Sequence, residues 1–453
     1  MARIMKNSLD RNYSVYVEMD ALKLARELVN QQETDEAFFI CGLRDLEQKV
    51  KLWQQELPQV TPYYAVKVCS DPVILRTMNS LGVSFDCSNK RELKTVLDMG
   101  VTPDRIVHAN TVKSTSHLKY ASEHGVTLMT FDSAEELVRM DDKNARLLLR
   151  IAASEFGSRW TMNEKFCAYS HEIENILKVA LKLGRNVVGV AFHVGCAYHH
   201  PDIFVNTIDH AKQVFDMGTE MGFRMNVLDI GGGFPGGVRK QDTLAKVCEA
   251  VRFTIDKHFP PSSGVKIIAE PGQFFVTAAY SLVVRVVGKR QREISIDGVV
   301  CSHVDVFINE STENCVSRYL YPFLDIQLHP LTPPFDRPRN VVTSLWGATC
   351  NPIDRMEERT LMFDVTVDEW LFMDNMGPYG LVRATGFNGF GFPLVKYRLY
   401  ITTVDKTPPV QRLVDSMVMR GGYGQVEESI MARHPSKPIP VADAGADEKG
   451  LEA

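Results

Sequence analysis

The sequence lacks the features that define several classes of protein. Its 51 Lys and Arg residues are outnumbered by 56 Asp and Glu residues, so no basic excess is present to attract nucleic acid or an acidic membrane surface. No apolar run approaches the ~18 residues that a membrane-spanning helix needs, and the N-terminal MARIMKNSLDRNYSVY lacks the apolar core of a signal peptide. These absences predict a cytoplasmic protein that acts on a small molecule or binds another protein.

Paired cysteine motifs are also missing. The nine cysteines are odd in number and none stand in CxxC spacing, which argues against a disulfide framework and against structural zinc. We therefore expect free thiols, most of them in the core, and no metal site.

What the sequence does contain is a repeated alternation of short apolar segments with stretches of helical period. Each apolar segment is rich in strand-forming residues, and this alternation is typical of parallel sheets. The eight segments are 62–67, 83–86, 105–110, 126–132, 145–152, 186–194, 225–231 and 265–270. Eight such units predict an α/β fold, a (β/α)8 TIM barrel, which we place at residues 36–277.

The remaining segments differ in character from the barrel. A chain of 453 residues exceeds what one hydrophobic core usually serves, so a second domain is expected. Residues 278–410 show β-forming runs with little helical period, and we predict that they join residues 10–35 in a mostly antiparallel β domain. Residues 424–453 are polar and poor in aromatics, which predicts a disordered tail.

Polar residues stand at the ends of otherwise apolar strands. Barrel active sites are built from the C-terminal ends of the strands, so these residues are expected to share one rim. A single such residue is more often a satisfied polar group at a loop edge, but six on one rim indicate a site. The six are Lys67, Asp86, Arg150, His193, Gly231 and Glu270.

The glycine-rich stretch 231–237 follows the seventh strand. Its GxGxxG spacing fits a dinucleotide fold, but that motif belongs in an opening βαβ unit and not at a seventh strand. A phosphate cradle suits a late barrel strand better, because backbone N–H groups can approach an anion where no Cβ interferes. A simple tight turn is the remaining alternative.

Lys67 ends the first strand, where burial would lower its pKa and free its lone pair to attack an aldehyde. The alternative is a lysine whose ammonium extends into solvent. Together with a phosphate cradle, an imidazole at His193 that can stack on a ring, and an acid at Glu270 that can pair with a pyridine nitrogen, Lys67 indicates a pyridoxal 5'-phosphate site.

Motifs along nearly the whole chain resemble the eukaryotic ornithine decarboxylase family, which includes antizyme-inhibitor relatives. They are PYYAVK, FDCSNK, FHVG, LDIGGGFPGG, AEPG, WGATC, DNMGPY and FNGF. The resemblance implies a homodimer with two active sites at the interface, in which Cys350 of WGATC reaches the partner's site. It also implies that Lys165 and Asp354 bridge the two subunits.

The same resemblance assigns roles to the site residues. Lys67 would hold the cofactor aldehyde, and Cys350 would return a proton to Cα after carbon dioxide leaves. The other cofactor contacts implied are Asp86, Arg150, His193, Cys196, Gly231, Gly232, Gly233, Glu270, Gln273 and Tyr379.

Departures from the family pattern concern phosphate and substrate. Cys196 stands where the family has Ser and Gln273 where it has Arg, so cofactor affinity is expected to fall. The two aspartates that hold the substrate's distal amine in the family are matched by Pro322 and Asn351, near Phe387 of FNGF. We therefore expect a neutral aliphatic substrate such as leucine, unless a three-residue shift in alignment places Asp325 at the position of Pro322.

A catalytically inactive antizyme inhibitor is the alternative function. The chain keeps Asp86, Arg150, Cys350 and Tyr379, of which inactive relatives have lost one or more, and this favours an enzyme. Residues 118–140 resemble the family's antizyme-binding element, with Lys119, Glu136 and Leu137 at matching positions, but they must equally build strand four and its helix.

Overall fold

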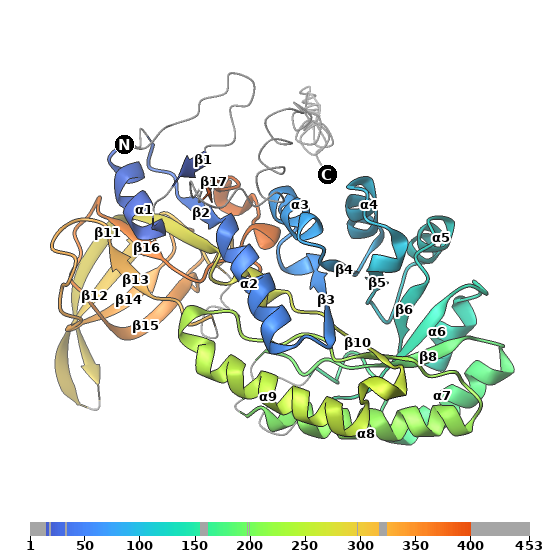
Figure 1. Ribbon diagram of the computed structural model, residues 1–453. Helices are drawn as coiled ribbons and strands as arrows, with labels where there is room; N and C mark the ends of the chain where they lie inside the picture. The colour runs from blue at the N-terminus through green and yellow to red at the C-terminus, as the bar shows by residue number, and fades with distance from the viewer. Residues whose placement is uncertain are drawn as a thin grey trace, which may run out of the picture.

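The computed structural model describes residues 15–17, 20–31, 34–154, 162–196, 198, 200–296, 298–316 and 324–399. Figure 1 shows a barrel surrounded by helices and a β-rich lobe beside it. In the part of the chain that is described, no helix is both long and apolar enough to cross a membrane. The expected tail at 424–453 and Pro322 lie outside these residues.

All eight segments expected to form barrel strands do so. They close a parallel barrel in the order β10-β3-β4-β5-β6-β7-β8-β9, which confirms the (β/α)8 prediction. The strands are β3 (Val60–Ala65), β4 (Ser84–Cys87), β5 (Ile106–His108), β6 (Leu128–Phe131), β7 (Arg146–Arg150), β8 (Val187–Ala191), β9 (Val227–Asp229) and β10 (Lys266–Ala269).

Helices cover the outside of the barrel, and several begin where the sequence supplies a cap. Asp71 accepts from the Val73 N–H with Pro72 at the first helical position, and Asn89 accepts from the Glu92 N–H. The helices are α2 (Leu43–Glu56), α3 (Pro72–Ser80), α4 (Lys90–Asp98), α5 (Thr115–Glu123), α6 (Ala134–Arg139), α7 (Ser170–Lys182), α8 (Asp202–Glu220), α9 (Gln241–His258) and the short α10 (Gln273–Val276).

The interior of the barrel is filled with apolar side chains, because alternate residues of each strand point inward. They form a buried cluster of Tyr63, Val107, Leu128, Leu148, Val188, Ala191, Val227 and Ile268. A packed interior leaves the strand ends and their loops as the place for polar chemistry.

The second lobe is a mixed, mostly antiparallel sheet in the order β1-β17-β2-β11-β12-β14-β15, with β16 pairing both β11 and β13. The parallel pairs are β1 with β17, β17 with β2, and β12 with β14. The strands are β1 (Val15–Val17), β2 (Phe38–Gly42), β11 (Tyr280–Ile296), β12 (Val299–Ile308), β13 (Leu328–Pro330), β14 (Val341–Trp346), β15 (Arg355–Met362), β16 (Trp370–Met373) and β17 (Leu394–Leu399), with helix α1 (Ala21–Val29) packed on them.

The N-terminal strand β2 belongs to this sheet, where it pairs with β11 and β17. It runs directly into α2, the first helix against the barrel. We therefore propose that the barrel domain begins near residue 43 and not at residue 36.

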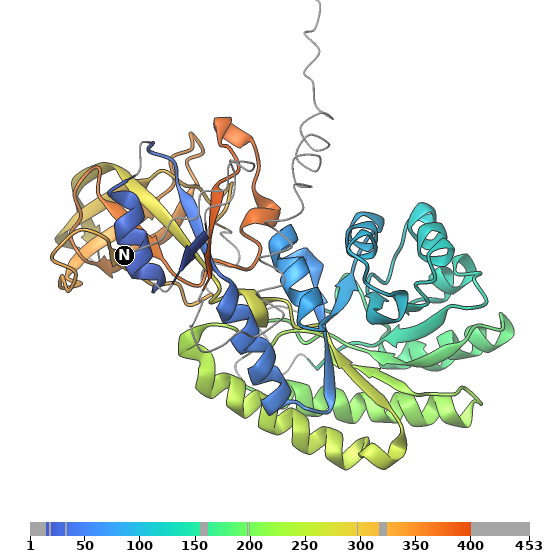
Figure 2. The ribbon, with the colours of Figure 1, turned by 45° about the horizontal axis from the view of Figure 1, so that its top comes forward.

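A buried carboxylate joins the two lobes, which lie side by side in Figure 2. Asp71, in the loop after β3, accepts hydrogen bonds from the hydroxyls of Tyr280 on β11 and Tyr397 on β17, both at 2.6 Å. Because Asp71 lies only four residues after Lys67, this contact fixes the rim of the barrel against the β domain.

Candidate active site

Five of the six residues expected on one rim, all but Gly231, act on one another around the Lys67 ammonium. Lys67 occupies the short turn Val66–Val68 after β3, and its ammonium forms an ion pair with Asp86 at the end of β4. Glu270, after β10, also acts electrostatically on Lys67, and Arg150 at the end of β7 acts on Asp86. His193, after β8, interacts with both Arg150 and Lys67.

The charge state of Lys67 differs from the prediction. Burial alone would lower its pKa, but the negative charges of Asp86 and Glu270 outweigh burial and raise the pKa above its ordinary value. The expectation of a lysine deprotonated by burial is therefore wrong for the protein without cofactor: Lys67 is an ammonium held by a buried carboxylate.

Asp229 is a member of the site that sequence reasoning missed. It ends β9, is fully buried, and lies close enough to Glu270 for the two carboxyl groups to act on each other's pKa. Burial and the neighbouring Asp86 raise the pKa of Asp229 to about 7, and burial together with Asp229 raises the pKa of Glu270. Two carboxyl groups this close cannot both ionise readily, so the pair shares a proton.

His193 is a neutral imidazole. Burial, Arg150 and Lys67 lower its pKa to about 3. The Gly195 N–H donates to Nδ1 of His193 at 2.9 Å, which leaves the ring proton on Nε2. A neutral, oriented ring of this kind can stack on an aromatic cofactor.

The glycines after β9 pack directly against the neighbouring loop. Gly231 and Gly233 have φ of 63° and 101°, and a Cβ at Gly233 would lie 2.3 Å from the Gly195 carbonyl oxygen. A Cβ at Gly232 would lie 2.9 Å from Nε2 of His193. Only glycine fits this stretch, so the turn is compact enough for backbone N–H groups to meet an anion.

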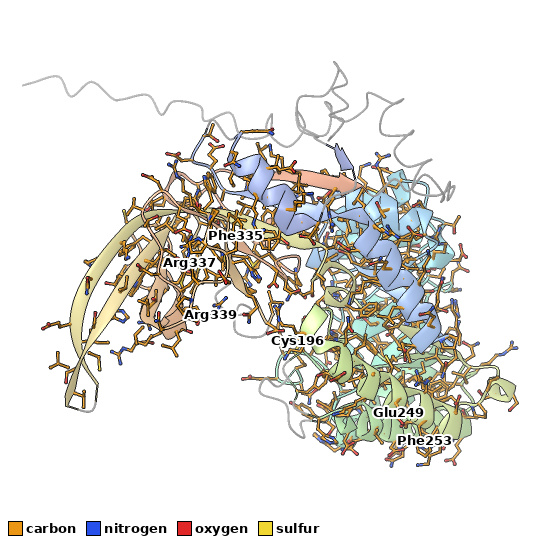
Figure 3. All side chains as sticks on the ribbon, turned by 60° about the vertical axis from the view of Figure 1, so that its left-hand side comes forward. Cys196, Glu249, Phe253, Phe335, Arg337 and Arg339 are labelled. Atoms are coloured by element: carbon orange, nitrogen blue, oxygen red, sulfur yellow. The ribbon has the colours of Figure 1, made fainter. Side chains whose placement is uncertain are left out.

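Other residues expected near the phosphate approach the same place. Tyr379 is bound through its N–H to the Val68 carbonyl at 2.8 Å, and its hydroxyl interacts with Lys67 and Cys196. Cys196 lies on the side of the barrel that faces the β domain (Figure 3). Gln273 opens α10, and its amide lies 3.4 Å from the Phe234 carbonyl oxygen.

Three buried polar atoms of the site residues lack a hydrogen-bond partner among the described residues. They are Oδ1 of Asp86, Nε of Arg150 and Oδ2 of Asp229. Buried polar atoms are rarely left unpaired, so their presence indicates a polar molecule at the rim. A ring bearing an aldehyde, a hydroxyl and a phosphate fits this set of an amine, carboxyl groups, an imidazole and a glycine turn.

A second group of expected residues lies in the loops of the β domain. Cys350 is exposed, and its N–H donates to Oδ1 of Asn388, the residue after Phe387, at 3.1 Å. Cys350 and Asn351 line a cavity of about 540 Å³ whose other walls, among them Arg290 and Trp346, also come from the β domain. The cysteine thus lies in a separate half-site from Lys67.

Both the nitrogen and the oxygen of the Asn351 side-chain amide form hydrogen bonds. Its Nδ2 donates to Oε1 of Glu313 at 2.8 Å, and its Oδ1 accepts from the Ile353 N–H at 3.2 Å. Glu313, a second residue that sequence reasoning missed, therefore places a carboxylate beside the expected substrate position.

Asp325, the alternative to Pro322, is also engaged. Oδ2 of Asp325 accepts from Nε of Arg239 at 3.0 Å, in a salt bridge between the β domain and the loop after β9. A carboxylate already paired in this way is a poor acceptor for a substrate amine.

The expected subunit bridge involves two residues in different surroundings. Lys165 is exposed, with its ammonium 5.0 Å from the centre of the Phe166 ring. Asp354 is buried and accepts hydrogen bonds from Ser311, from the N–H and hydroxyl of Thr312, and from those of Thr349. Asp354 therefore already stabilises its own protomer.

Residues 118–140 form part of α5, all of β6 and all of α6. Of the three residues that match the antizyme-binding element, Lys119 is exposed, whereas Glu136 and Leu137 are buried. Glu136 pairs with the buried Lys113 and with Arg139. Two of the three residues thus serve the packing of the barrel.

Comparison with known proteins agrees with this geometry. Residues 43–277 match the family model of the pyridoxal-dependent decarboxylases, pyridoxal binding domain. Ornithine decarboxylase of Rattus norvegicus is 36% identical over 377 residues, which cover 82% of each chain. The chain belongs to the ornithine decarboxylase family. The matched domain is that of pyridoxal-dependent decarboxylases, and pyridoxal phosphate is accordingly the cofactor of this amino acid decarboxylase.

Two further relatives show that similar proteins carry different functional names. Antizyme inhibitor 2 of Xenopus laevis is 35% identical over 390 residues, covering 84% of this chain and 85% of the relative. The arginine decarboxylase of Paramecium bursaria Chlorella virus, solved with bound agmatine, superposes with a TM-score of 0.76 at 31% identity, over 83% of this chain and all of the viral one. The family therefore includes proteins named for different substrates and one named for binding antizyme.

Proposed function

We propose that this decarboxylase acts on a neutral, aliphatic amino acid such as leucine, releasing carbon dioxide and the corresponding amine. The observation that carries the proposal is the state of Asn351. It is neutral, and both ends of its amide are already hydrogen-bonded, to Glu313 and to the Ile353 N–H. It offers no charge to a substrate ammonium, which would lose several kcal/mol if buried without a partner.

Asp325 does not supply the missing charge. Its carboxylate is paired with Arg239, so the shifted alignment would place at the substrate position a residue that already has a cationic partner. This supports the assignment of Pro322 to that position, although Pro322 itself lies outside the described residues.

The roles we assign to the barrel residues follow from their contacts. Lys67 would hold the cofactor through its aldehyde, with Asp86 and Arg150 beside the lysine nitrogen. His193 would stack on the ring, and Glu270, with Asp229 beside it, would pair with the pyridine nitrogen. The residues that would hold the phosphate are the glycine turn 231–233, Cys196, Gln273 and Tyr379.

When bound, pyridoxal phosphate supplies the electron sink that makes loss of carbon dioxide from Cα feasible. The chain must then deliver a proton to Cα, and a thiol can do so. We assign this to Cys350. Because its surroundings come from the β domain alone, we propose that it acts in the partner's site of a homodimer.

The decisive experiment is a screen of amino acids for carbon dioxide release by the purified protein with pyridoxal phosphate. Leucine should be decarboxylated faster than ornithine or lysine. The double variant Pro322→Asp with Asn351→Asp should gain activity on ornithine and lose it on leucine, since it restores two carboxylates. Wild-type activity on ornithine equal to that on any neutral amino acid would refute the proposal.

Glu313 requires its own control, because its carboxylate lies beside Asn351. If Glu313 held a substrate ammonium, the wild type would accept ornithine and Glu313→Gln would abolish that activity. We expect instead that Glu313→Gln leaves the preference for leucine over ornithine unchanged. Asp325→Ala serves as the matched control for the alternative alignment.

An antizyme-binding role without catalysis is the second candidate, supported by the likeness to antizyme inhibitor 2. The ion pair of Lys67 with Asp86 and the burial of Glu136 and Leu137 favour catalysis. Protein that takes up no pyridoxal phosphate even at saturation would reverse this preference.

A further inference from the structure

A salt-bridge network joins the loop after β9 to the β domain. Arg239 lies in the turn Val238–Lys240, two residues beyond the glycine stretch 231–237. Its Nη1 and Nη2 donate to the two carboxylate oxygens of Asp374, at 2.9 and 3.0 Å, and its Nε donates to Asp325 at 3.0 Å. A planar guanidinium that binds one carboxylate with two parallel bonds fixes orientation as well as distance.

The acceptors of Arg239 are themselves held in place. Asp374 also accepts from the Gln327 N–H at 2.7 Å. Despite partial burial, His329, Arg239 and the Gln327 N–H together hold the pKa of Asp374 below its usual value. The carbonyl oxygen of Asp325 accepts from both Arg239 and Nδ2 of Asn375. Arg239 therefore joins two segments of the β domain, 325–327 and 374–375, at one point.

The segment that begins at Asp374 leads into the active site. A Cβ at Gly377 would lie 1.8 Å from the Val276 carbonyl oxygen, so the segment packs directly on the end of α10. Five residues after Asp374, Tyr379 is bound to the Val68 carbonyl and its hydroxyl interacts with Lys67. The glycine turn and Tyr379 are thus carried by two chain segments that Arg239 holds together.

We propose that Arg239 is a positioning residue that closes the β domain onto the barrel at the phosphate end of the site and thereby slows the release of pyridoxal phosphate. This rests on the proposed assignment of the glycine turn and Tyr379 to the phosphate. Arg239 itself does not touch the cofactor. It acts by keeping the two walls of the phosphate site at a fixed separation.

The test is the rate at which bound cofactor leaves, measured as loss of visible absorbance after free cofactor is removed. Arg239→Ala should release pyridoxal phosphate about tenfold faster, and Asp374→Asn should do nearly the same. The double variant should be no faster than Arg239→Ala, because Asp374→Asn removes a contact that Arg239→Ala has already removed. Arg239→Lys should fall between wild type and Arg239→Ala, since it keeps the charge and loses the bidentate fork.

Two controls separate positioning from a general loss of structure. Arg252→Ala removes a guanidinium of similar exposure, 35% against 38% for Arg239, which pairs with Glu56 between α9 and α2. It should leave the release rate unchanged. Pyridoxal, which lacks the phosphate, should bind Arg239→Ala and wild type within twofold of each other. An equal loss of affinity for both ligands would overturn the proposal.

The variant Tyr379→Phe distinguishes an error in the role of Arg239 from an error in the location of the phosphate site. Tyr379→Phe should release pyridoxal phosphate faster and leave pyridoxal unaffected. If Tyr379→Phe is without effect, the assignment of the phosphate site is wrong. If Tyr379→Phe is faster but Arg239→Ala is not, the phosphate site is correct and the role of Arg239 is wrong.

Discussion

Asp86 forms an ion pair with the half-buried Lys67 on the rim of the barrel. The side chain of Asp86 is fully buried, one of its oxygens meets the Lys67 ammonium, and the other has no hydrogen-bond partner in the described chain. Before it can attack an aldehyde, Lys67 must therefore give up a proton that this carboxylate stabilises.

Asp86→Asn should make Lys67 easier to deprotonate. With Asp86 neutral, the largest influence that raises the pKa of Lys67 is lost, and the pKa falls because burial disfavours the ammonium. The rate at which the cofactor-free protein takes up pyridoxal phosphate can be followed by visible absorbance at a series of pH values. In Asp86→Asn this rate should rise at a lower pH than in wild type. Lys67→Ala should show no covalent uptake, and Asp98→Asn, which removes an exposed partner of Lys94, should not shift the profile. An unchanged profile for Asp86→Asn would contradict the ion-pair account.

Asp229 and Glu270 should make the stability of the cofactor-free protein depend on pH. The pKa of Asp229 is raised to about 7 in the folded protein from its ordinary value of 3.8, so the folded state binds the proton more tightly than the unfolded state. Stability should therefore fall as pH rises from about 4 to 7, by up to about 1.4 kcal/mol per unit.

Asp229→Asn should flatten this decline, because it removes both the titrating carboxyl and the charge that raises the pKa of Glu270. Denaturant unfolding of the cofactor-free protein at pH 5, 6 and 7 would show the effect. If the free energy of unfolding changes with pH equally in wild type and in Asp229→Asn, the two carboxyl groups do not share a proton.

The sequence predicted the barrel because each strand is a short β-branched run set between helical stretches. It also indicated the polar rim, since the polar residues at several strand ends are visible as breaks in apolar runs. The partners of those residues were harder to predict. Burial of Lys67 was foreseen, but the sign of its pKa shift depends on Asp86, which lies nineteen positions away.

Asp229 was missed because it precedes the glycine turn and reads as part of the strand. The contact of Arg239 with Asp374 spans 135 positions, and that of Asn351 with Glu313 spans 38. The first pair depends on how the barrel packs on the β domain, and the second on how two loops of the β domain meet. Neither periodicity nor composition encodes such contacts.

If Cys350 serves the partner's site, two inactive variants should restore activity when mixed. Lys67→Ala lacks the aldehyde-holding amine and Cys350→Ala lacks the proton donor. Random exchange of subunits makes half of the dimers mixed, and each mixed dimer has one intact site of two, so about a quarter of wild-type activity should return. No recovery after exchange verified by mass spectrometry would place Cys350 and Lys67 in the same subunit's site.

Lys165 and Asp354 should respond differently to substitution, because only one of them is buried. Asp354→Asn weakens five charge-assisted contacts from Ser311, Thr312 and Thr349 and should cost the protomer about 2 to 3 kcal/mol at neutral pH. The pKa of Asp354 is lowered by these hydrogen bonds, so this stability is present above pH 4 and is lost as the carboxyl protonates in acid.

Lys165→Glu should leave the free energy of unfolding within about 0.5 kcal/mol of wild type, since Lys165 is exposed. If Lys165 and Asp354 bridge the subunits, Lys165→Glu should nevertheless weaken the dimer, as measured by sedimentation. The control Lys178→Glu, which changes an exposed lysine on α7, should not weaken it. Equal dimer affinity for the two lysine variants would leave Asp354 with its role inside the protomer alone.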